Sequence, residues 1–423
     1  MRNILKYFIL FSFFCVFCFS QIKEKDVFEK KLSNGMKVVI VKTTHNPFVG
    51  VNVTYKVGSV NDKKQHLTGL AHFIEHMSLK GTSSITFEKL YDYYLSNGGE
   101  ISNKIARTGK YITSFNLSMP KNKLKFMLEF ESDRMKNLNF TGFENEKNVI
   151  QNEYNINRSN IIKDLHEFSV KSAFIEDDFG NSVVGELSDI KKINRTVLRK
   201  FYEENYNPQN SVITLVGDLS FNETYNLVNK YFGSIKNTNP NKNKINITAI
   251  KFPGEIKKDC KRKRKIRAVE VSFRKSLNVN EQPVFEIIGE YLVSKFDKSK
   301  KIRRVISNYT NFTVSRIFSL IAVPSQNRFL NSIEEKMISE FDDLEITKQE
   351  LEKIKVRLKT KYFRKLKSNL ETAYSIGKYE GLFEEGKYFT EFPERIDKVN
   401  LNEIKKIIKK YFVEENRIVA RAY

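Results

Sequence analysis

Two histidines and a glutamate fall within one helical turn of each other, at His72, Glu75 and His76. Residues four apart on a helix lie on the same face, so the two imidazoles could offer ring nitrogens to one ion about 2.0–2.1 Å away. Zinc held by two histidines and an acidic residue keeps a fourth position open for water, and a nearby glutamate can take the proton of that water as it attacks a carbonyl. The spacing therefore predicts a zinc site with its own base. A helix whose histidines make ordinary core or surface contacts is the alternative.

The sequence around these residues predicts that they lie on a helix over residues 66–80. Leu70, Ile74 and Met77 recur at helical spacing, and Gly81 could end the helix. The second half of the chain contains no histidine. Only the first half can therefore hold this kind of site.

A third ligand must come from elsewhere, and the helix predicted over residues 143–157 is the best candidate. Glu146, Ile150 and Glu153 fall at positions i, i+4 and i+7 of this segment, so two acids share its apolar face. A carboxylate on such a face is costly unless it is paired, hydrogen-bonded or bound to a metal. Glu146 and Glu153 are both candidates, and a solvated helix face is the alternative for this segment taken alone.

The residues around the motif, from Gly69 to Thr82, resemble the pitrilysin/insulinase family of zinc peptidases, which includes the mitochondrial processing peptidases. The order His-x-x-Glu-His is that of the inverzincins. The resemblance extends to residues 32–41 near the start, to the paired Gly98 and Gly99, and to residues 210–218. The chain is thus similar to a half-length member of this family.

The resemblance implies a role for each residue of the site. His72, His76 and Glu153 would bind one zinc ion per chain, and Glu75 would be the general base. Glu146 would orient a ligand from outside the metal's own coordination shell, as outer carboxylates do at metal sites.

The family resemblance also suggests substrate-binding residues. The stretch after the paired glycines resembles the sheet edge on which the family pairs its substrates, which makes Gly99, Ser102 and Asn103 candidates. The chain departs there from the family's usual Asn-Ala pattern, and this departure affects the expected peptide preference. In the second half, Arg304 and Tyr309 resemble an arginine and a tyrosine that hold the substrate backbone near the zinc. A strand that begins with an exposed arginine is the alternative reading of that segment.

The first twenty residues predict a secretory signal peptide. Arg2 and Lys6 precede an apolar run over residues 7–19, and Ser20 precedes the polar stretch that begins at Gln21. The run is short for spanning a bilayer, which takes about 20 apolar residues. We expect an exported protein without a stable transmembrane anchor that begins near Gln21, periplasmic if bacterial and otherwise secreted. A signal anchor that is not cleaved is the alternative.

Charge and cysteine content add two expectations. The chain has a formal net charge of +23 and a basic run at residues 257–267, which alone could indicate nucleic-acid binding. An export signal directs the chain away from nucleic acid, so we expect a solvated basic surface and no nucleic-acid partner. Only Cys260 remains after removal of the signal peptide, so we expect no internal disulfide.

An internal repeat predicts two homologous domains. Apolar and asparagine positions from 193 to 212 are matched from 399 to 418 at a constant offset of 206 residues. The expected parts are a signal peptide at 1–20, a zinc-bearing catalytic α+β domain at 21–236, a linker at 237–250 and a second α+β domain without metal at 251–423. Strands are predicted at 37–42, 50–56, 111–119 and 211–216, among helices at 66–80, 86–97, 121–136, 143–157 and 193–204. The resemblance implies that each domain is an antiparallel sheet covered by helices, and that the two face each other as half of a clamshell.

These observations together predict an exported zinc metalloendopeptidase that hydrolyses peptides or unfolded segments. Full-length relatives close a chamber with four domains, and this chain is half that size. We therefore expect a homodimer, or a heterodimer with an inactive homologue. A non-catalytic subunit that binds peptides or serves as a scaffold in such a heterodimer is the alternative.

Overall fold

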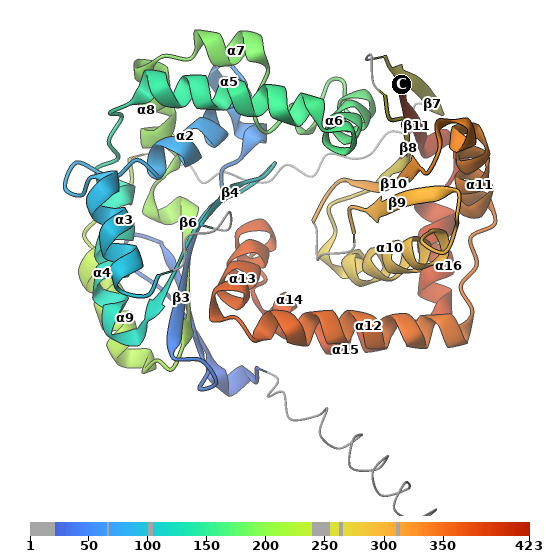
Figure 1. Cartoon of the computed structure of the whole chain (residues 1–423). Coiled ribbons are helices and arrows are strands. Elements are labelled where there is room, and N and C mark those ends of the chain that lie inside the picture. The colour runs from blue at the N-terminus through green and yellow to red at the C-terminus, as the bar shows by residue number, and fades with distance from the viewer. Residues whose placement is uncertain (1–21, 66, 100–104, 239–253, 262–264, 310–313) are drawn as a thin grey trace, which may run out of the picture.

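The computed structural model describes residues 22–65, 67–99, 105–238, 254–261, 265–309 and 314–423. The predicted signal peptide and most of the predicted linker lie outside these residues. The described chain forms two lobes that face each other, and each lobe combines one sheet with helices (Figure 1). The predicted fold class, two α+β domains that face each other, is confirmed.

The first lobe is built on a six-stranded sheet in the order β1-β2-β6-β3-β5-β4. Its strands are β1 (Val27–Lys31), β2 (Lys37–Lys42), β3 (Phe48–Tyr55), β4 (Ala106–Thr108), β5 (Thr113–Pro120) and β6 (Ser211–Gly217). Neighbouring strands are antiparallel except β2 and β6, which pair in parallel. Every residue of β6 is buried because it lies inside the sheet and both faces are covered.

Five helices of the first half lie close to the predicted positions: α2 (Leu70–Ser78), α3 (Phe87–Ser96), α4 (Leu124–Lys136), α5 (Phe143–Ser159) and α8 (Arg195–Asn205). Three further helices were not predicted: α6 (Ile161–Ala173), α7 (Leu187–Lys192) and α9 (Phe221–Phe232). α4 and α9 pack on the sheet, whereas α2 packs against α5, α8 and the edge strand β4. The helix with the motif is therefore held between the edge of the sheet and the helix that carries the candidate acids.

The second lobe is built on a five-stranded sheet in the order β7-β11-β8-β10-β9. Its strands are β7 (Ile256–Cys260), β8 (Ala268–Arg274), β9 (Ile302–Ser307), β10 (Ile317–Pro324) and β11 (Arg417–Ala422). Its helices are α10 (Gln282–Phe296), α11 (Leu330–Asp342), α12 (Lys348–Leu366), α13 (Asn369–Phe383), α14 (Lys387–Thr390), α15 (Phe392–Lys398) and α16 (Leu401–Tyr411). In the part of the chain that the structure describes, no helix is both long and apolar enough to cross a membrane.

Each sheet contains one parallel pair, β2 with β6 and β7 with β11, that the expectation of antiparallel sheets did not include. In each half the last strand comes after a helix and a short turn. β6 follows α8 in the first half, and β11 follows α16 in the second. A helix can return the chain to the same end of a sheet, which parallel pairing requires. The predominantly antiparallel character of the sheets is otherwise as predicted.

The two halves exchange helices. α6 packs against β8 and β11 of the second sheet, and α13 packs against β3 and β6 of the first. Glycine permits this close approach, because a Cβ atom at Gly377 would lie 1.9 Å from the side-chain oxygen of Asn52. The side-chain amide of Asn369, at the start of α13, donates a hydrogen bond to the carbonyl of Phe48. Each sheet is thus covered in part by the other half of the chain.

The internal repeat corresponds to equivalent local structure in the two halves. Asn194 caps the start of α8 and Asn400 caps the start of α16, each through a hydrogen bond from a backbone N–H to its side-chain oxygen. Asn210 and Asn416 each donate a side-chain hydrogen bond to the carbonyl five residues earlier. The repeated asparagines therefore fix the same helix-to-strand turn twice.

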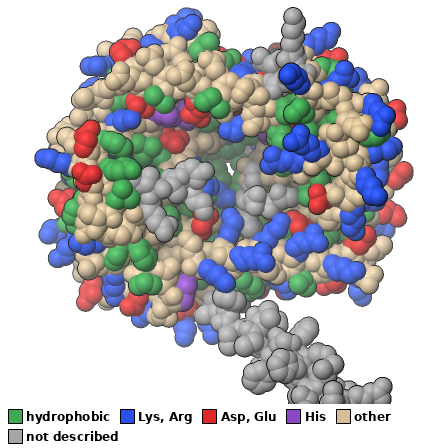
Figure 2. Space-filling view, in the orientation of Figure 1, with side chains coloured by type: hydrophobic (Ala, Val, Ile, Leu, Met, Phe, Trp, Pro, Cys, Tyr) green, Lys and Arg blue, Asp and Glu red, His purple; other side chains and the backbone are tan. Residues whose placement is uncertain are grey.

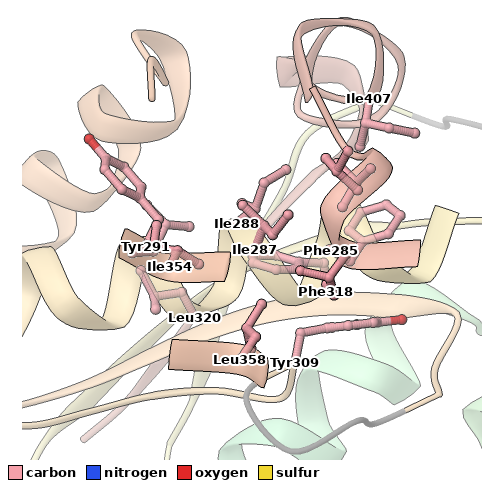
Figure 3. Packing of buried hydrophobic residues seen from close by; sticks show 14 of the residues in the cluster. Phe285, Ile287, Ile288, Tyr291, Tyr309, Phe318, Leu320, Ile354, Leu358 and Ile407 are labelled. Atoms are coloured by element: carbon pink, nitrogen blue, oxygen red, sulfur yellow. The ribbon is translucent and has the colours of Figure 1, made fainter. Parts of the chain in front are cut away.

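The core of the second lobe centres on α10, which packs against the sheet and against α12 and α16. Figure 3 shows side chains of these elements together, among them Phe285, Phe318 and Leu358. All three are fully buried or nearly so. Burying one side chain of this size contributes about 1.5–3 kcal/mol, so this apolar cluster is what stabilises a lobe without disulfides.

Candidate metal centre and active site

The helix that carries the motif, α2, is anchored in its first turn by a buried carboxylate. Asp62 accepts hydrogen bonds from the backbone N–H of Gly69 at 2.7 Å and of Ala71 at 3.0 Å. N–H groups at this end of a helix have no partner within it, and the helix dipole favours an acceptor there. Burial raises the pKa of Asp62 to about 8, while the backbone hydrogen bonds act in the opposite direction. Asp62 thus anchors the first turn of α2.

His72 and His76 of α2 meet Glu153 of α5 in one cluster. The Nε2 atom of His76 lies 3.3 Å from Oε2 of Glu153, and Nε2 of His72 lies 3.6 Å from the same oxygen. One ligand atom from each residue lies within 4.8 Å of the others. Two imidazoles and a carboxylate form the ligand set of zinc sites that keep a position open. The residues present therefore fit a zinc ion.

The protonation of two of these side chains, His72 and Glu153, suits metal binding. Burial and the neighbouring His76 lower the pKa of His72 to about 4. A hydrogen bond with His76 lowers the pKa of Glu153 to about 2, together with the charges of both histidines. Burial alone would lower the pKa of His76, but its hydrogen bonds to Glu153 and Glu146 outweigh burial and raise it. A neutral imidazole and an ionised carboxylate, which His72 and Glu153 supply near neutral pH, are the forms that bind metals.

Glu146 contacts His76 on the side of the ring opposite to Glu153. Its Oε2 atom lies 3.2 Å from Nδ1 of His76, and its Oε1 atom lies 2.8 Å from the ammonium group of Lys80. His76 is thus held through Nδ1 by Glu146 and faces Glu153 with Nε2. A carboxylate in this position orients a histidine ligand.

Glu75 lies on the same helix and faces the edge of the first sheet. Burial raises the pKa of its carboxyl group, while hydrogen bonds from the side chain and backbone of Thr108 on β4 act in the opposite direction. Glu75, His72 and Glu153 line the same cavity. The carboxylate therefore has a fixed orientation and access to the space beside the cluster.

This cavity has a volume of about 1450 Å³ and lies between the two lobes. Figure 2 shows the molecule hollowed there. α2, α5 and α6 of the first half contribute residues to its lining, as do α12 and α13 of the second half. Pockets for small ligands usually measure about 300–1,000 Å³. The cavity is therefore large enough for several residues of an extended peptide.

Comparison with known families agrees with this arrangement. Residues 37–186 match the family described as Insulinase (Peptidase family M16), and residues 192–358 match the one described as Peptidase M16 inactive domain. The chain belongs to the M16 peptidase family. The resemblance noted in the sequence is thereby confirmed. His72, His76 and Glu153 all fall within the first matched range.

One relative in sequence and two solved structures extend the comparison. The zinc protease PqqE of Helicobacter pylori is 25% identical over 368 residues, which cover 81% of this chain and 80% of that protein. A crystal structure of a protease from Helicobacter pylori superposes with a TM-score of 0.83 at 22% identity, covering 94% of this chain and 99% of that one. The periplasmic protease PqqL from Escherichia coli gives a TM-score of 0.73 at 16% identity, covering 95% of this chain and 48% of that one. The two solved structures confirm the fold of the chain. The name of PqqE, a zinc protease, suggests that the metal is zinc.

The predicted substrate edge of this M16 chain is only partly described. Ser102 and Asn103 lie outside the described residues. Gly99 is buried just after α3, where its N–H donates to the carbonyl of Tyr94 and a Cβ atom would lie 2.6 Å from the Tyr94 ring. Gly99 does not line the cavity, whereas Arg107 of β4 does. In this structure Gly99 therefore packs against the ring of Tyr94. The cavity meets the edge of the sheet at Arg107 on β4.

The structure does not bring Arg304 and Tyr309 to the metal centre. Tyr309 is fully buried in the second lobe, where its hydroxyl donates a hydrogen bond to the carbonyl of Ser315 and its ring packs on Phe285. Arg304 is exposed on β9, and neither residue lines the cavity. The prediction for this pair is corrected. Tyr309 is a core residue, because an aromatic ring gains more from burial against other rings than from an exposed position, and Arg304 lies outside the cavity lining.

Several cavity residues were not predicted. Among them are His166 of α6 and the basic residues Arg107, Lys110 and Lys378. His166 is held by Glu270 of the second lobe, with Nδ1 at 2.9 Å from the carboxylate oxygen. These residues come from separate elements of both halves, so no local spacing in the sequence could group them.

Proposed function

We propose that this chain is an exported zinc metalloendopeptidase that hydrolyses peptides or unfolded protein segments. The cluster of His72, His76 and Glu153, which shares a cavity with Glu75, is the observation that carries the proposal. The cluster supplies three ligands from two rigid helices and borders open space on one side. This combination fits a catalytic zinc site better than a structural one, in which four protein ligands close the coordination shell.

In this proposal each residue has one role. His72, His76 and Glu153 hold one zinc ion per chain, and Glu146 orients the ring of His76. A zinc ion bound there supplies a Lewis acid that makes water more acidic and polarises a carbonyl oxygen. Glu75 accepts the proton of the attacking water and passes it to the leaving amine of the peptide. The raised pKa of Glu75 supports this role, because the group must hold the proton between the two transfers.

The sheet edge at β4 supports a peptide as the substrate. Within the described residues β4 pairs only with β5, so its other edge is available for a further strand. Thr108 of this strand contacts Glu75, and an extended peptide that pairs with β4 would pass beside the base. Backbone pairing gives affinity with little demand on sequence. The space between the lobes is far smaller than a folded domain, so we expect flexible substrates only.

The N-terminal sequence supports export. The first twenty residues have the composition of a signal peptide, and a structural neighbour from Escherichia coli is described as periplasmic. The mature chain would then contain the metal-bearing domain at 21–236, a linker at 237–250 and the second domain at 251–423. N-terminal sequencing of exported protein should begin near Gln21. An intact Met1 on membrane-bound protein would favour an uncleaved anchor instead.

The arrangement of two lobes supports an assembly. The chain covers 48% of the structure of PqqL with the same fold, and two lobes form only part of a chamber around a peptide. We therefore expect a homodimer, or a heterodimer with an inactive homologue. Light scattering of the purified protein tests the first alternative. A monomer that hydrolyses peptides at full rate would remove the need for any partner.

Incubation of the mature protein with a peptide library, with and without a chelator, tests the proposed function. We expect cleavage that stops when the chelator removes the metal and returns when zinc is restored. The Glu75→Gln variant controls for a contaminating protease, because it should lack this activity. A preparation that binds zinc and peptides but cleaves none would instead support a non-catalytic peptide-binding subunit.

A further inference from the structure

The cavity contains a histidine that the proposed chemistry at zinc does not use. His166 of α6 lines the cavity together with residues of the metal centre. Its Nδ1 atom lies 2.9 Å from Oε1 of Glu270 on β8, so the sheet of the second lobe holds a residue of the first half. His166 therefore lies where the two halves meet and borders the space that a substrate would occupy.

Buried groups beneath the cavity fix the orientation of the His166 ring. Glu270 is fully buried, and its Oε1 atom also accepts a hydrogen bond from the hydroxyl of Ser272 at 2.7 Å. The Ser272 hydroxyl lies 3.0 Å from that of Ser319, and both serines are fully buried. An ionised carboxylate only accepts hydrogen bonds, so Nδ1 of His166 carries the proton of this contact.

The other ring nitrogen of His166, Nε2, is accessible. The side chain is 32% exposed, although Nδ1 faces the buried carboxylate. In the part of the chain that the structure describes, Nε2 makes no hydrogen bond and is not enclosed. Because His166 lines the cavity, this nitrogen faces the cavity. A histidine held through one nitrogen and open at the other is oriented to contact a ligand.

His166 lies near the end of the strand edge that we propose for substrate pairing. Burial and the charge of Lys110 act to lower the pKa of His166, but Glu270 and Glu167 outweigh them and raise it. The effect of Lys110 requires its ammonium group to be close, and this residue follows β4 by two positions. Thr108, the last residue of β4, contacts Glu75. A peptide that pairs with β4 and continues past Thr108 would therefore reach His166.

We propose that His166 binds the backbone of the peptide substrate through Nε2. The inference rests on the proposed peptidase function and assigns a second substrate contact in the same cavity. Each residue of a peptide presents a carbonyl oxygen and, except in proline, an N–H group. The backbone thus offers a partner whether or not Nε2 carries a proton. Like pairing with β4, this contact adds affinity and makes no demand on the side chains of the substrate.

Binding measured without hydrolysis tests this contact. In zinc-loaded Glu75→Gln protein, fluorescence anisotropy gives Kd for labelled peptides of unrelated sequence. Adding His166→Asn should raise Kd about 3–10-fold for all of them, the usual effect of one lost hydrogen bond. The asparagine amide takes the place of Nδ1 and can still contact Glu270, whereas no atom takes the place of Nε2.

Two outcomes of this measurement would contradict different claims. Binding that His166→Asn leaves unchanged would overturn the inference and leave the proposed peptidase function standing. A zinc-loaded protein that binds no peptide would contradict the proposed function and the inference together. His45→Asn is the control, because Nε2 of His45 lies 3.0 Å from the carbonyl of Leu366 in the other half but His45 does not line the cavity. We expect the parent Kd in this control.

His166→Gln separates peptide binding from a structural role of the histidine. Its amide can reach the position of Nε2 but leaves Glu270 without the Nδ1 contact. We expect this variant to bind peptides more tightly than His166→Asn, although the buried carboxylate without its partner makes it the less stable of the two. Thermal unfolding measures the stability. If the more stable variant is also the tighter binder, His166 acts only through the structure and the inference is wrong.

Ester replacement tests whether the contact is with the backbone. In each peptide of a series one amide is replaced by an ester, which removes the N–H and weakens the carbonyl as an acceptor. We expect one position at which the ester weakens binding to Glu75→Gln protein but has no further effect when His166→Asn is added. Effects of the ester and of His166→Asn that add at every position would show that the two groups do not interact, and would overturn the inference.

Discussion

Glu146 lies 3.2 Å from Nδ1 of His76 through its Oε2 atom, and this contact determines which nitrogen of His76 faces the metal centre. The other ring nitrogen, Nε2, lies 3.3 Å from Glu153. Two acids of one helix therefore hold the same imidazole from both sides. Lys80 holds the second oxygen of Glu146 at 2.8 Å, which fixes the carboxylate in turn.

Glu146→Gln should reduce zinc affinity or peptidase activity by about 10–100-fold, as for other carboxylates that orient a metal ligand. The amide can still contact His76, but it carries no negative charge to support the ring. Zinc titration with a competing chelator measures the loss. Glu144→Gln is the matched control, because Glu144 is exposed on the same turn of α5. Equal zinc affinity in the two variants would exclude the orienting role.

Glu153→Ala should lose the zinc ion, because it removes the only carboxylate in the cluster of candidate ligands. His72→Ala and His76→Ala should do the same. Elemental analysis of each purified variant gives the zinc content per chain, and circular dichroism checks that each one is folded. Full occupancy in Glu153→Ala would show that the third ligand is a different residue.

Asp62 should make the stability of the apo protein depend on pH. Its pKa in the folded protein is raised to about 8 from an ordinary value of 3.8, so between these values the folded state holds a proton that the unfolded state has released. The stability contributed by this group is complete below pH about 4 and is lost as pH rises through about 8. We expect wild type to lose more unfolding free energy than Asp62→Asn between pH 5 and pH 8. Chemical denaturation measures both, and parallel pH profiles would contradict the expectation.

Gly377→Ala should destabilise the contact between the two halves. The added methyl group would lie 1.9 Å from the side-chain oxygen of Asn52, so α13 must move or the Asn52 side chain must leave its hydrogen bonds with Asn116 and Thr54, at a cost of about 1–3 kcal/mol or more. Thermal unfolding measures the loss. Gly109→Ala is the control, because its methyl group would lie 3.6 Å from the nearest atom. A Gly377 variant as stable as this control would mean that the helix adapts without cost.

The sequence predicted the features that depend on the local spacing of residues, which are the helices and the motif that one of them carries. Helical periodicity identified α2 and α5, and the order of His72, Glu75 and His76 indicated the metal chemistry that we propose for this chain. The choice of Glu153 over Glu146 as the third ligand came from the family resemblance, because both acids lie on one helical face and periodicity cannot separate them.

Long-range packing was not predictable in the same way. Periodicity shows that α13 has a buried face, but it does not show that this face packs on the sheet of the other half. Gly377 carries a faint signal, since a glycine inside a helix often marks a close approach. Tyr309 was assigned to the site by a short match, although its ring is held in the core beside Phe285.

Metal content and peptide hydrolysis, measured on one preparation of Glu75→Gln, test the central claim most directly. The substitution keeps both histidines and Glu153, so the variant should hold one zinc ion per chain. It removes the base, so hydrolysis should fall by several orders of magnitude, because proton removal and proton delivery are lost together. Full zinc content with near-normal hydrolysis would contradict the assignment of Glu75 and the mechanism built on it.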